Sequence, residues 1–463
     1  MRVVGLIGIA LLLSVLPATA LRAGVISANP SNYQTLLGGL NPGDTLNLAA
    51  GTYPRLSLDG LNGAPGAFIT IQGPASGAPA VITVDPGNPV CCNVVQLDSN
   101  SYLALKNLRV DSGLTGMDGV NSRGVTHDIL VENCTFVGQG ADQLTVAINT
   151  KGTAWNWVIR GNTITQAGTG MYLGNSDGTF PFINGLVEGN LTVDTIGYTA
   201  EFKYQIPYAL PAGLDAGPHR TIIRNNVWVK TIPQSAWPPG AAVGARPNLL
   251  VGGFPASGPG SGDMYEIYGN FFFDNEEGES LFQGSGVVSM HDNVFVGGSY
   301  RAMSFQDHDL PLSKAYAYNN TVYGNVTGIS VSGGSIVDAL VTGNLIFAAS
   351  GVSVPVAGMQ KDNIATTMAN AGTYVNLPSL TPGAMDFYPK TGSAAKGAAL
   401  DMSKFILHTD YALDFNGTSK GTFLYRGAYA GEGTNPGWAL KLEKKASGPP
   451  VPAPAAPKNL RIR

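Results

Sequence analysis

The sequence predicts an all-β protein, a right-handed parallel β-helix, from a repeated asparagine frame, a glycine-rich composition and a low content of charge. The chain has 61 glycines in 463 residues and 13% charged residues, against averages of about 7% and about 25%. This composition is typical of many short strands and turns. Apolar segments recur in one frame: an alternating strand, a bend at an asparagine and a second strand. Such a frame is expected of the coils of a solenoid.

Nine segments carry the frame. The step between successive asparagines is as short as 23 residues and reaches 36 and 44 on the two sides of Asn226. Propeller blades need about 40 to 50 residues, so the shorter steps favour a β-helix whose longer steps hold insertions. Stacked coils place each asparagine about 4.8 Å from the next, where the side-chain amides can bond in a ladder. The frame asparagines are Asn107, Asn133, Asn162, Asn190, Asn226, Asn270, Asn293, Asn320 and Asn344.

The repeat is predicted to form one domain, residues 21–435. Residues 1–20 combine an early Arg2, an apolar run and an Ala-Thr-Ala end, which is typical of a cleaved signal peptide. The segment Tyr33–Leu37 is expected to form a short helix that caps the first coil, because a solenoid must protect its terminal sheet edges. Residues 436–463 contain a run rich in proline and alanine and are expected to be a disordered tail. A secreted or periplasmic location follows from the signal peptide.

Charge and cysteine content exclude several classes. The net charge of −4 argues against a generic basic surface for nucleic acid. Beyond the signal peptide, no stretch reaches the roughly 20 apolar residues of a membrane span. Cys91, Cys92 and Cys134 are too few for a disulfide scaffold and lack zinc-site spacing. Either one of the first two bridges Cys134 or all are buried thiols, and the oligomeric state stays open.

The opening of the repeat points to a known class of proteins. It reads Leu40-Asn41-Pro42-Gly43-Asp44-Thr45-Leu46-Asn47-Leu48, then Gly51-Thr52-Tyr53 and Phe68-Ile69-Thr70-Ile71. These runs resemble the opening of bacterial parallel β-helix proteins related to the alginate lyase and chondroitinase B type of polysaccharide lyase. The runs Asp414–Gly417 and Arg426–Tyr429 look like the C-terminal cap of secreted proteins of that class. The resemblance implies a polysaccharide partner and, in the lyases, abstraction of the C5 proton of a uronic acid.

Long turn insertions around residues 198–262 mark the expected substrate groove. They cost ordering entropy without adding repeat-to-repeat packing, so their reason is sought outside folding. They are rich in proline, glycine and aromatic rings, and exposed rings on rigid loops suit stacking against sugars, although packing is an equal alternative. The candidate substrate-binding rings are Tyr204, Tyr208 and Trp237.

Strand alternation turns Lys203 outward. Lys203 is the centre of a first candidate catalytic cluster. Elimination or epimerisation at a uronic acid needs a cation for the carboxylate, a base for the C5 proton and an acid. The insertions are expected to bring His219, Arg220 and Arg246 to Lys203. In the related lyases a lysine acts as base and an arginine assists, but the sequence around Lys203 does not match their motifs.

A second cluster is the run Gln306-Asp307-His308-Asp309, with Arg301 nearby and Gln283 one coil earlier. It resembles the Asp-Pro-His-Asp motif of alginate C5-epimerases, whose histidine is catalytic, and the match covers the histidine and the last aspartate. Arg301, Gln283 and Gln306 are candidate substrate ligands. The coil spacing separates Lys203 and His308 by about three coils, roughly 14 Å.

The acidic turn at Glu276, Glu277 and Glu279 is a candidate Ca²⁺ site, since Ca²⁺ takes six or more oxygens; the alternative is a solvated turn. The favoured function is a polysaccharide lyase. A C5-epimerase and a glycoside hydrolase remain open, the hydrolase ranking lower because the Asp-Asp and Gly-His-Gly signatures of β-helix polygalacturonases are missing. A non-catalytic glycan-binding or cell-surface structural β-helix also remains open, since a fold alone implies no activity.

Overall fold

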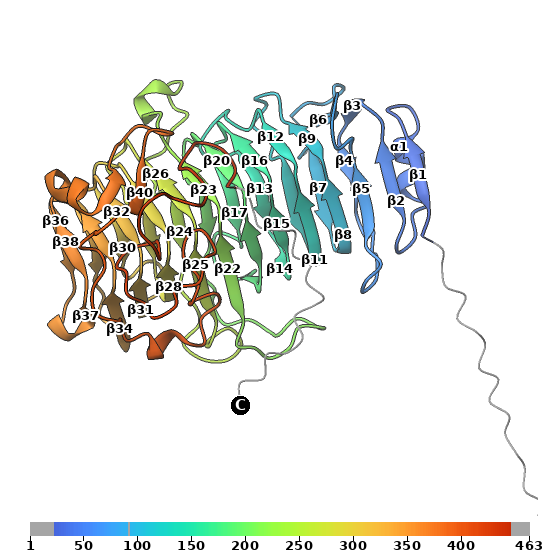
Figure 1. Ribbon diagram of the computed structural model, residues 1–463. Coiled ribbons are helices and arrows are strands. Elements are labelled where there is room, and N and C mark those ends of the chain that lie inside the picture. The colour runs from blue at the N-terminus through green and yellow to red at the C-terminus, as the bar shows by residue number, and fades with distance from the viewer. Residues whose placement is uncertain (1–22, 91–92, 446–463) are drawn as a thin grey trace, which may run out of the picture.

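The computed structural model describes residues 23–90 and 93–445 and is a parallel β-helix. Its coils stack in chain order from one end of the molecule to the other (Figure 1). In each full coil the chain passes through three long sheets, and each strand pairs in parallel with the strands of the coils before and after. The fold class predicted from the repeat is confirmed.

Three sheets and a short hairpin account for the strands. The 15-stranded sheet contains β1 (Val25–Ala28), β2 (Thr45–Leu48), β5 (Ile69–Gln72), β8 (Ser101–Lys106), β11 (Val125–Glu132), β14 (Thr153–Trp155), β15 (Val158–Arg160), β18 (Phe182–Ile183), β19 (Leu186–Glu188), β22 (Arg220–Arg224), β25 (Met264–Tyr268), β28 (Gly286–His291), β31 (Leu312–Tyr318), β34 (Asp338–Thr342) and β37 (Gln360–Lys361). The 12-stranded sheet contains β3 (Gly51–Pro54), β6 (Ala80–Thr83), β9 (Leu108–Asp111), β12 (Thr135–Val137), β16 (Thr163–Thr165), β20 (Leu191–Val193), β23 (Val227–Val229), β26 (Phe271–Phe273), β29 (Val294–Val296), β32 (Thr321–Tyr323), β35 (Leu345–Phe347) and β38 (Ile364–Thr366).

The 11-stranded sheet contains β4 (Leu56–Ser57), β7 (Val95–Asp98), β10 (Val120–Arg123), β13 (Val146–Thr150), β17 (Thr169–Leu173), β21 (Ala200–Phe202), β24 (Leu249–Val251), β27 (Phe282–Gly284), β30 (Arg301–Phe305), β33 (Thr327–Val331) and β36 (Ser350–Ser353). The antiparallel pair is β39 (Val375–Leu377) with β40 (Asp386–Pro389). The helices are α1 (Tyr33–Leu37) and the 3₁₀ turns η1 (Gln234–Ala236), η2 (Ala357–Met359), η3 (Met368–Thr373) and η4 (Ser403–Phe405).

The core lies between the three sheets and follows the alternation read from the sequence. In β21, Phe202 belongs to the apolar core while Glu201 lies on the outer face. In β30, Met303 and Phe305 belong to the same core, and Ser304 lies outside it. The predicted facing of both strands is confirmed.

The asparagine ladder is present from Asn162 onward. Asn190 is representative: its Nδ2 donates to Asn226 Oδ1 at 2.9 Å and to the carbonyl of Ile159, and its backbone N–H donates to the same Asn226 oxygen at 3.0 Å. The ladder ends at Asn363, one coil beyond the last predicted member. Because each amide bonds both a backbone carbonyl and the next amide inside a buried bend, the row is a structural element.

The frame of the first two segments was wrong by one residue. The ladder position in the third of these coils is Asn162, and its oxygen accepts from the backbone N–H of Cys134, not from Asn133. Asn107 and Asn133 instead occupy the preceding position, with φ of 54° at both residues, where Gly161 has φ of 64°. Asparagine and glycine both tolerate this left-handed conformation, which explains why the sequence frame confused the two positions.

Helix α1 caps the first coil as predicted, with Tyr33 and Leu37 buried. The C-terminal region, expected at the end of the helix, packs along the flank of the later coils instead (Figure 1). Phe415 and Tyr429 join an apolar cluster with Phe271 of β26 and other outward residues of the 12-stranded sheet. This face is apolar on its outer side, so it needs a cover.

Leu440 is buried in the same cluster, so the tail boundary predicted at residue 436 is wrong: packed structure continues to residue 445. The predicted signal peptide and residues 446–463 lie outside the described residues, as do Cys91 and Cys92. Cys134 is a buried free thiol, and burial raises its pKa to about 12. No helix among residues 23–90 and 93–445 is long and apolar enough to cross a membrane.

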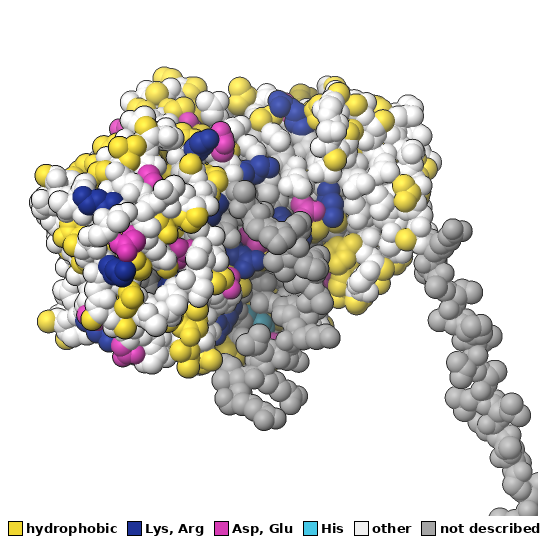
Figure 2. Space-filling model, in the orientation of Figure 1, with side chains coloured by type: hydrophobic (Ala, Val, Ile, Leu, Met, Phe, Trp, Pro, Cys, Tyr) yellow, Lys and Arg dark blue, Asp and Glu magenta, His cyan; other side chains and the backbone are white. Residues whose placement is uncertain are grey.

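Three long connections surround the outer face of β21 and β24. Residues 203–219 and 252–263 both leave the 11-stranded sheet toward the 15-stranded sheet, and residues 230–248 enter it from the 12-stranded sheet. The predicted insertions therefore flank both ends of the same two strands. Elsewhere, the face seen in Figure 2 mixes Lys and Arg with Asp and Glu and shows no extended area of one charge.

Candidate functional site

The outer face of the 11-stranded sheet carries a row of residues in register across successive coils, all of them polar or aromatic except Leu250. Asn149 of β13 pairs with Tyr172 of β17, Tyr172 with Glu201 of β21, and Glu201 with Leu250 of β24. The row continues through Gln283 of β27 to Ser304 of β30. The row thus passes between the long connections and is the candidate functional site.

Lys203, the residue after β21, lies at the centre of this face. Its Nζ lies 3.1 Å from Glu201 Oε1 and 3.5 Å from Asp309 Oδ2, and its side chain is 11% exposed. Glu201 is 4% exposed, so the carboxylate lies beneath the ammonium. Lys203 thus lies on the outer face, as the alternation predicts, but it is mostly covered because two acidic groups hold the side chain against the sheet.

His308 reaches the same carboxylate from the connection after β30. A tight turn brings His308 and Leu310 together, and Asp309 between them has φ of 51°. His308 Nδ1 lies 3.2 Å from Asp309 Oδ2, an ion-pair distance without hydrogen-bond alignment. Lys203 and His308 therefore contact one oxygen atom. The separation of roughly 14 Å predicted from coil spacing is wrong, because the turn and the long lysine side chain close the gap.

We call Glu201, Lys203, His308 and Asp309 the Lys203 cluster. Two aromatic rings border it: Lys203 Nζ is 5.3 Å from the ring centre of Tyr204 and 6.0 Å from that of Tyr172. The Tyr204 ring is thus placed beside the cluster, as its candidate role requires. Aromatic faces attract a cation and also offer a flat surface to a sugar ring.

Electrostatics favour a charged lysine in this cluster. Burial opposes the charge of Lys203, but Glu201, Tyr172 and Asp309 outweigh it, and the pKa of Lys203 is raised. Burial raises the pKa of Glu201, although Lys203 limits the rise. Burial and Glu201 raise the pKa of Tyr172, which keeps the phenol protonated. At neutral pH, Lys203 is therefore a cation for a carboxylate and Tyr172 a proton donor.

Arg246 borders the same region from the connection 230–248. Its guanidinium carbon lies 5.7 Å from the ring centre of Tyr198, and its charge acts on Glu201. The backbone carbonyl of Arg246 accepts from Nζ of the buried Lys230 and from Nδ2 of Asn275, both at 2.9 Å. These two bonds hold the connection in place.

His219 and Arg220 make their contacts away from Lys203. His219 lies between Asp215 and Asp263, with Nε2 3.1 Å from the first and Nδ1 3.3 Å from the second. Arg220 starts β22 on the 15-stranded sheet, and its Nη1 lies 2.6 Å from Glu266 and donates to the carbonyl of Leu407. The predicted four-residue grouping is therefore wrong for these two residues, because the chain crosses to another sheet at residue 220.

The candidate substrate ligands of the second cluster lie along the same outer row. Gln283 pairs with Ser304, whose hydroxyl donates to Gln306 Oε1 at 2.8 Å. Arg301 Nη1 donates to the same hydroxyl at 3.2 Å, and its guanidinium lies 4.7 Å from the ring centre of Tyr300. These groups extend the polar row on the C-terminal side of the Lys203 cluster.

The other two predicted rings occupy the insertions. The hydroxyl of Tyr208 is buried and lies near Gly260, and Asp263 acts on it, which places it with the His219 group. Trp237 follows η1, and its indole N–H is also buried. Buried polar tips favour packing over stacking on a sugar for these two residues.

The acidic turn does not form a metal site in the described structure. No group of three His, Cys, Asp or Glu side chains within residues 23–90 and 93–445 is arranged to hold a metal ion. Glu277 instead accepts from the backbone N–H of Gln234, and Glu276 is exposed. The three glutamates of this turn therefore do not fit a Ca²⁺ site.

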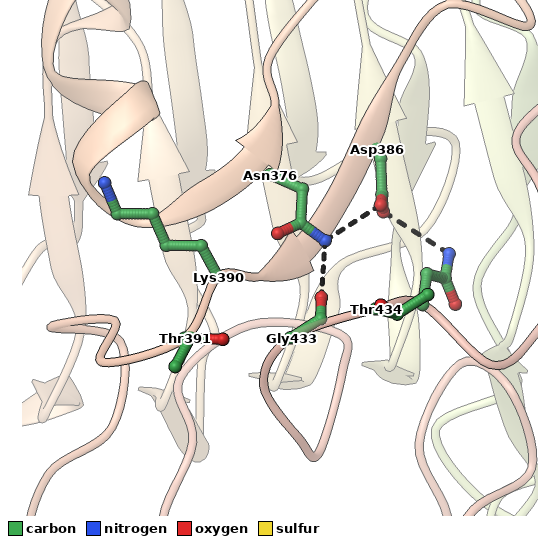
Figure 3. Close-up of a pocket in the computed structure, with 7 residues that line it drawn as sticks. Asn376, Asp386, Lys390, Thr391, Gly433 and Thr434 are labelled. Atoms are coloured by element: carbon green, nitrogen blue, oxygen red, sulfur yellow. Dashed lines mark hydrogen bonds between the residues drawn. The ribbon is translucent and has the colours of Figure 1, made fainter.

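Two surface depressions lie elsewhere. One, at the β39–β40 hairpin, is lined by Asn376, Asp386 and Lys390 (Figure 3). Asn376 Nδ2 donates to Asp386 Oδ2 at 2.9 Å and to the carbonyl of Gly433 at 2.7 Å, so its polar groups satisfy one another. The other lies near Asn47 and Gln72 at the first coils. Neither contains the convergent acid, base and cation of the Lys203 cluster.

Sequence reasoning missed Tyr172, Tyr198 and Lys151 as members of this surface. Lys151 Nζ lies 4.4 Å from the ring centre of Tyr172. A signal was present, because Lys151 follows Asn149 as Lys203 follows Glu201, by two residues. Recognising this spacing requires the strand register of the 11-stranded sheet. The asparagine frame lies at a different bend of the coil and does not give that register.

Comparisons with known proteins concern the overall fold. No protein-family model matches the chain, and no curated protein matches its sequence. Among solved structures, pectate lyase Pel9A has 13% identity over 91% of this chain and 96% of its own, with a TM-score of 0.44. The PL6 family polysaccharide lyase Pedsa3628 from Pseudopedobacter saltans has 11% identity over 74% and 93%, with a TM-score of 0.46. The GH136 lacto-N-biosidase from Eubacterium ramulus has 11% identity over 74% and 68%, with a TM-score of 0.37. The solved structures to which this chain is similar thus include polysaccharide lyases and a glycoside hydrolase.

Proposed function

We propose that this chain is a secreted polysaccharide lyase that acts on a uronic-acid-containing polymer at the Lys203 cluster. The observation that carries the proposal is the convergence of Lys203 Nζ and His308 Nδ1 on Asp309 Oδ2, at 3.5 Å and 3.2 Å. A cation and an imidazole at one point are the pair that proton abstraction beside a carboxylate requires.

The roles follow from charge and exposure. Lys203, kept cationic by Glu201 and Asp309, neutralises the substrate carboxylate and so makes the C5 proton more acidic. His308 is 32% exposed and accepts that proton on a ring nitrogen. Tyr172, kept protonated by burial, is the donor to the leaving oxygen. Glu201 is a positioning residue, since it lies beneath Lys203 and fixes its ammonium.

An epimerase would share the first step. In an epimerase the donor returns a proton to the opposite face of C5, whereas in a lyase the bond to the neighbouring sugar breaks. The run that contains His308 and Asp309 favours this alternative through its resemblance to the epimerase motif.

Hydrolysis is favoured by one other observation. Glu201 and Asp309 are two carboxylates that contact the same ammonium, and burial raises the pKa of Glu201, as an acid catalyst needs. However, Glu201 is 4% exposed and covered by Lys203, which leaves it little access to a glycosidic oxygen. We therefore rank hydrolysis below the lyase and the epimerase.

The test is a product screen of the purified chain on uronate polymers and on neutral polymers. A lyase produces unsaturated sugars, which absorb in the ultraviolet; a hydrolase produces reducing ends without that absorbance. An epimerase changes the sugar composition at constant chain length. Binding without any product would contradict the catalytic proposal and favour a glycan-binding protein.

A further inference from the structure

Lys151 is a cation of the outer row that the proposed mechanism does not use. It follows β13, is partly buried, and its Nζ lies 4.4 Å from the ring centre of Tyr172. The same ring lies 6.0 Å from Lys203 Nζ. Tyr172 is therefore bordered by two ammonium groups.

Unlike Lys203, Lys151 has no ion-pair partner among the described residues. The carboxylate of Asp118 acts on it only at a distance. That carboxylate is already engaged: it accepts from Asn121 Nδ2 at 2.8 Å, from Asn149 Nδ2 at 2.7 Å and from the N–H of Val146 at 2.9 Å. Burial lowers the pKa of Lys151, although the carboxylates of Asp118 and Glu201 oppose the shift. The Tyr172 ring attracts this ammonium, but no carboxylate neutralises it, so a partly buried positive charge is left for an acidic ligand.

Two amide oxygens on β10 and on β13, the strand that leads up to Lys151, are also unpartnered. Asn121 and Asn149 pair in register and are 5% and 2% exposed. Because both amide nitrogens donate to Asp118, each Oδ1 is left as a buried acceptor without a donor in the described structure. Buried acceptors are normally satisfied. Both oxygens are covered, so the group of this row that a sugar carboxylate can reach is the ammonium of Lys151, which is only partly buried.

The spacing connects this group to the Lys203 cluster. Asn149, Tyr172 and Glu201 occupy one row, so Lys151 and Lys203, each two residues further along, lie in equivalent positions two coils apart, about 10 Å. Resting on the proposed function, we propose that Lys151, on the far side of the Tyr172 ring from Lys203, binds a second carboxylate of the polymer. The substrate class that fits is a polymer whose acid groups recur along the chain, not a neutral glycan with an isolated acid.

The test measures binding separately from turnover. Oligogalacturonates and oligomannuronates of two to six units, with neutral cello-oligosaccharides as a comparison, are titrated into the full chain and into Lys151→Gln. The matched control is Lys314→Gln, an exposed lysine of the 15-stranded sheet. We expect Lys151→Gln to weaken binding of the longer acidic oligomers by about tenfold, since a hydrogen-bonded charge pair is lost. Lys314→Gln should match the wild type, and Lys151→Arg should retain most of the affinity.

The outcomes separate the two proposals. Lys151-dependent binding with ultraviolet-absorbing product supports both, and a raised KM at unchanged kcat supports a subsite away from the reacting carbon. Lys151-dependent binding without product supports the subsite and contradicts the lyase. Wild-type affinity in a correctly folded Lys151→Gln overturns the subsite while the lyase stands. A wild-type chain that binds no acidic oligomer overturns both.

Discussion

Two outer faces of the same coils use charge in opposite ways. On the 15-stranded sheet, Lys106, Glu132, Arg160, Glu188 and Arg224 follow one another in register with alternating sign. Neighbours pair along the row, from Lys106 to Glu132 at 3.0 Å through to Arg224 and Glu188 at 2.8 Å. On the 11-stranded sheet, charge is gathered at the Lys203 cluster, and Lys151 stays unpaired in the described structure.

Beyond Arg224 the first face continues as a stack of rings. His291 lies between Tyr268 and Tyr318, with ring centres 4.7 and 4.6 Å away. Burial lowers the pKa of His291 well below its usual value, so the ring is neutral. The C-terminal region covers this part through Lys420 and His408. The comparison teaches that polar groups which satisfy one another serve the fold, and that groups left without partners indicate a ligand.

The largest expected effect lies on the covered face. Lys420→Met removes the ammonium that lies 2.7 Å from Asp292 Oδ2, with both side chains buried. His291 Nδ1, 2.8 Å from the same oxygen, remains. Burial raises the pKa of Asp292 to about 8 even beside Lys420, so without the ammonium this carboxyl takes up a proton. Removing one member of a buried pair costs up to about 3 to 5 kcal/mol. Chemical denaturation should show this loss, while turnover per folded molecule stays unchanged. A loss of turnover without destabilisation would mean that this face, too, contains a site.

The next effect lies at the Lys203 cluster. His308→Ala and Lys203→Gln should each lower turnover by about 100-fold, because each removes a group that handles the proton or the substrate carboxylate. Ser330→Ala, one coil beyond Ser304 in the same row, is the control and should keep wild-type turnover.

Stability should distinguish the two variants. His308→Ala should leave the melting temperature almost unchanged. Lys203→Gln should lower it, since Glu201 loses its partner beneath the surface. The double variant Glu201→Gln/Lys203→Gln should regain stability without regaining turnover. Full turnover in both single variants would contradict the site.

The sequence predicted the parts of the molecule that repeat. The asparagine frame predicted the coil, and the alternation in β21 and β30 predicted the outward facing of Glu201 and Ser304. The frame failed at Asn107 and Asn133 because asparagine suits both a ladder position and a left-handed bend.

The site escaped prediction where it depends on side-chain reach and on register. Lys203 and His308 meet because Asp309 turns back at φ of 51°, a feature that coil counting ignores. Lys151 and Tyr172 belong to the site through the pairing of β13, β17 and β21, which no single motif records. Arg220 was misplaced because a strand boundary at that residue moves it to another sheet.

A smaller effect tests the ladder, the third kind of row. Asn190→Ala should destabilise the protein by about 1 to 3 kcal/mol, because it leaves the carbonyl of Ile159 without its donor inside a buried bend. Asn107→Gly, at the left-handed position, should change stability by no more than about 0.5 kcal/mol. Turnover per folded molecule should survive in both. Equal losses of stability in the two variants would contradict the distinction between a ladder position and a left-handed position.

The smallest effect concerns the two connections that leave the 11-stranded sheet on the same side. His219 joins them, since it lies between Asp215 on one and Asp263 on the other. Burial opposes protonation of His219, but the two carboxylates outweigh it and its pKa is raised. Because the pKa of His219 is higher in the folded than in the unfolded protein, the protonated ring stabilises the folded state. This stabilisation is complete below the unfolded pKa of about 6.5 and is lost as the pH rises through the folded pKa.

Proteolytic cleavage of these connections should therefore accelerate above neutral pH in the wild type. In His219→Gln it should be faster at about pH 6 and nearly independent of pH, and because Asp215 is largely exposed we expect the difference to be modest. Identical pH profiles for the two proteins would show that His219 does not join the connections.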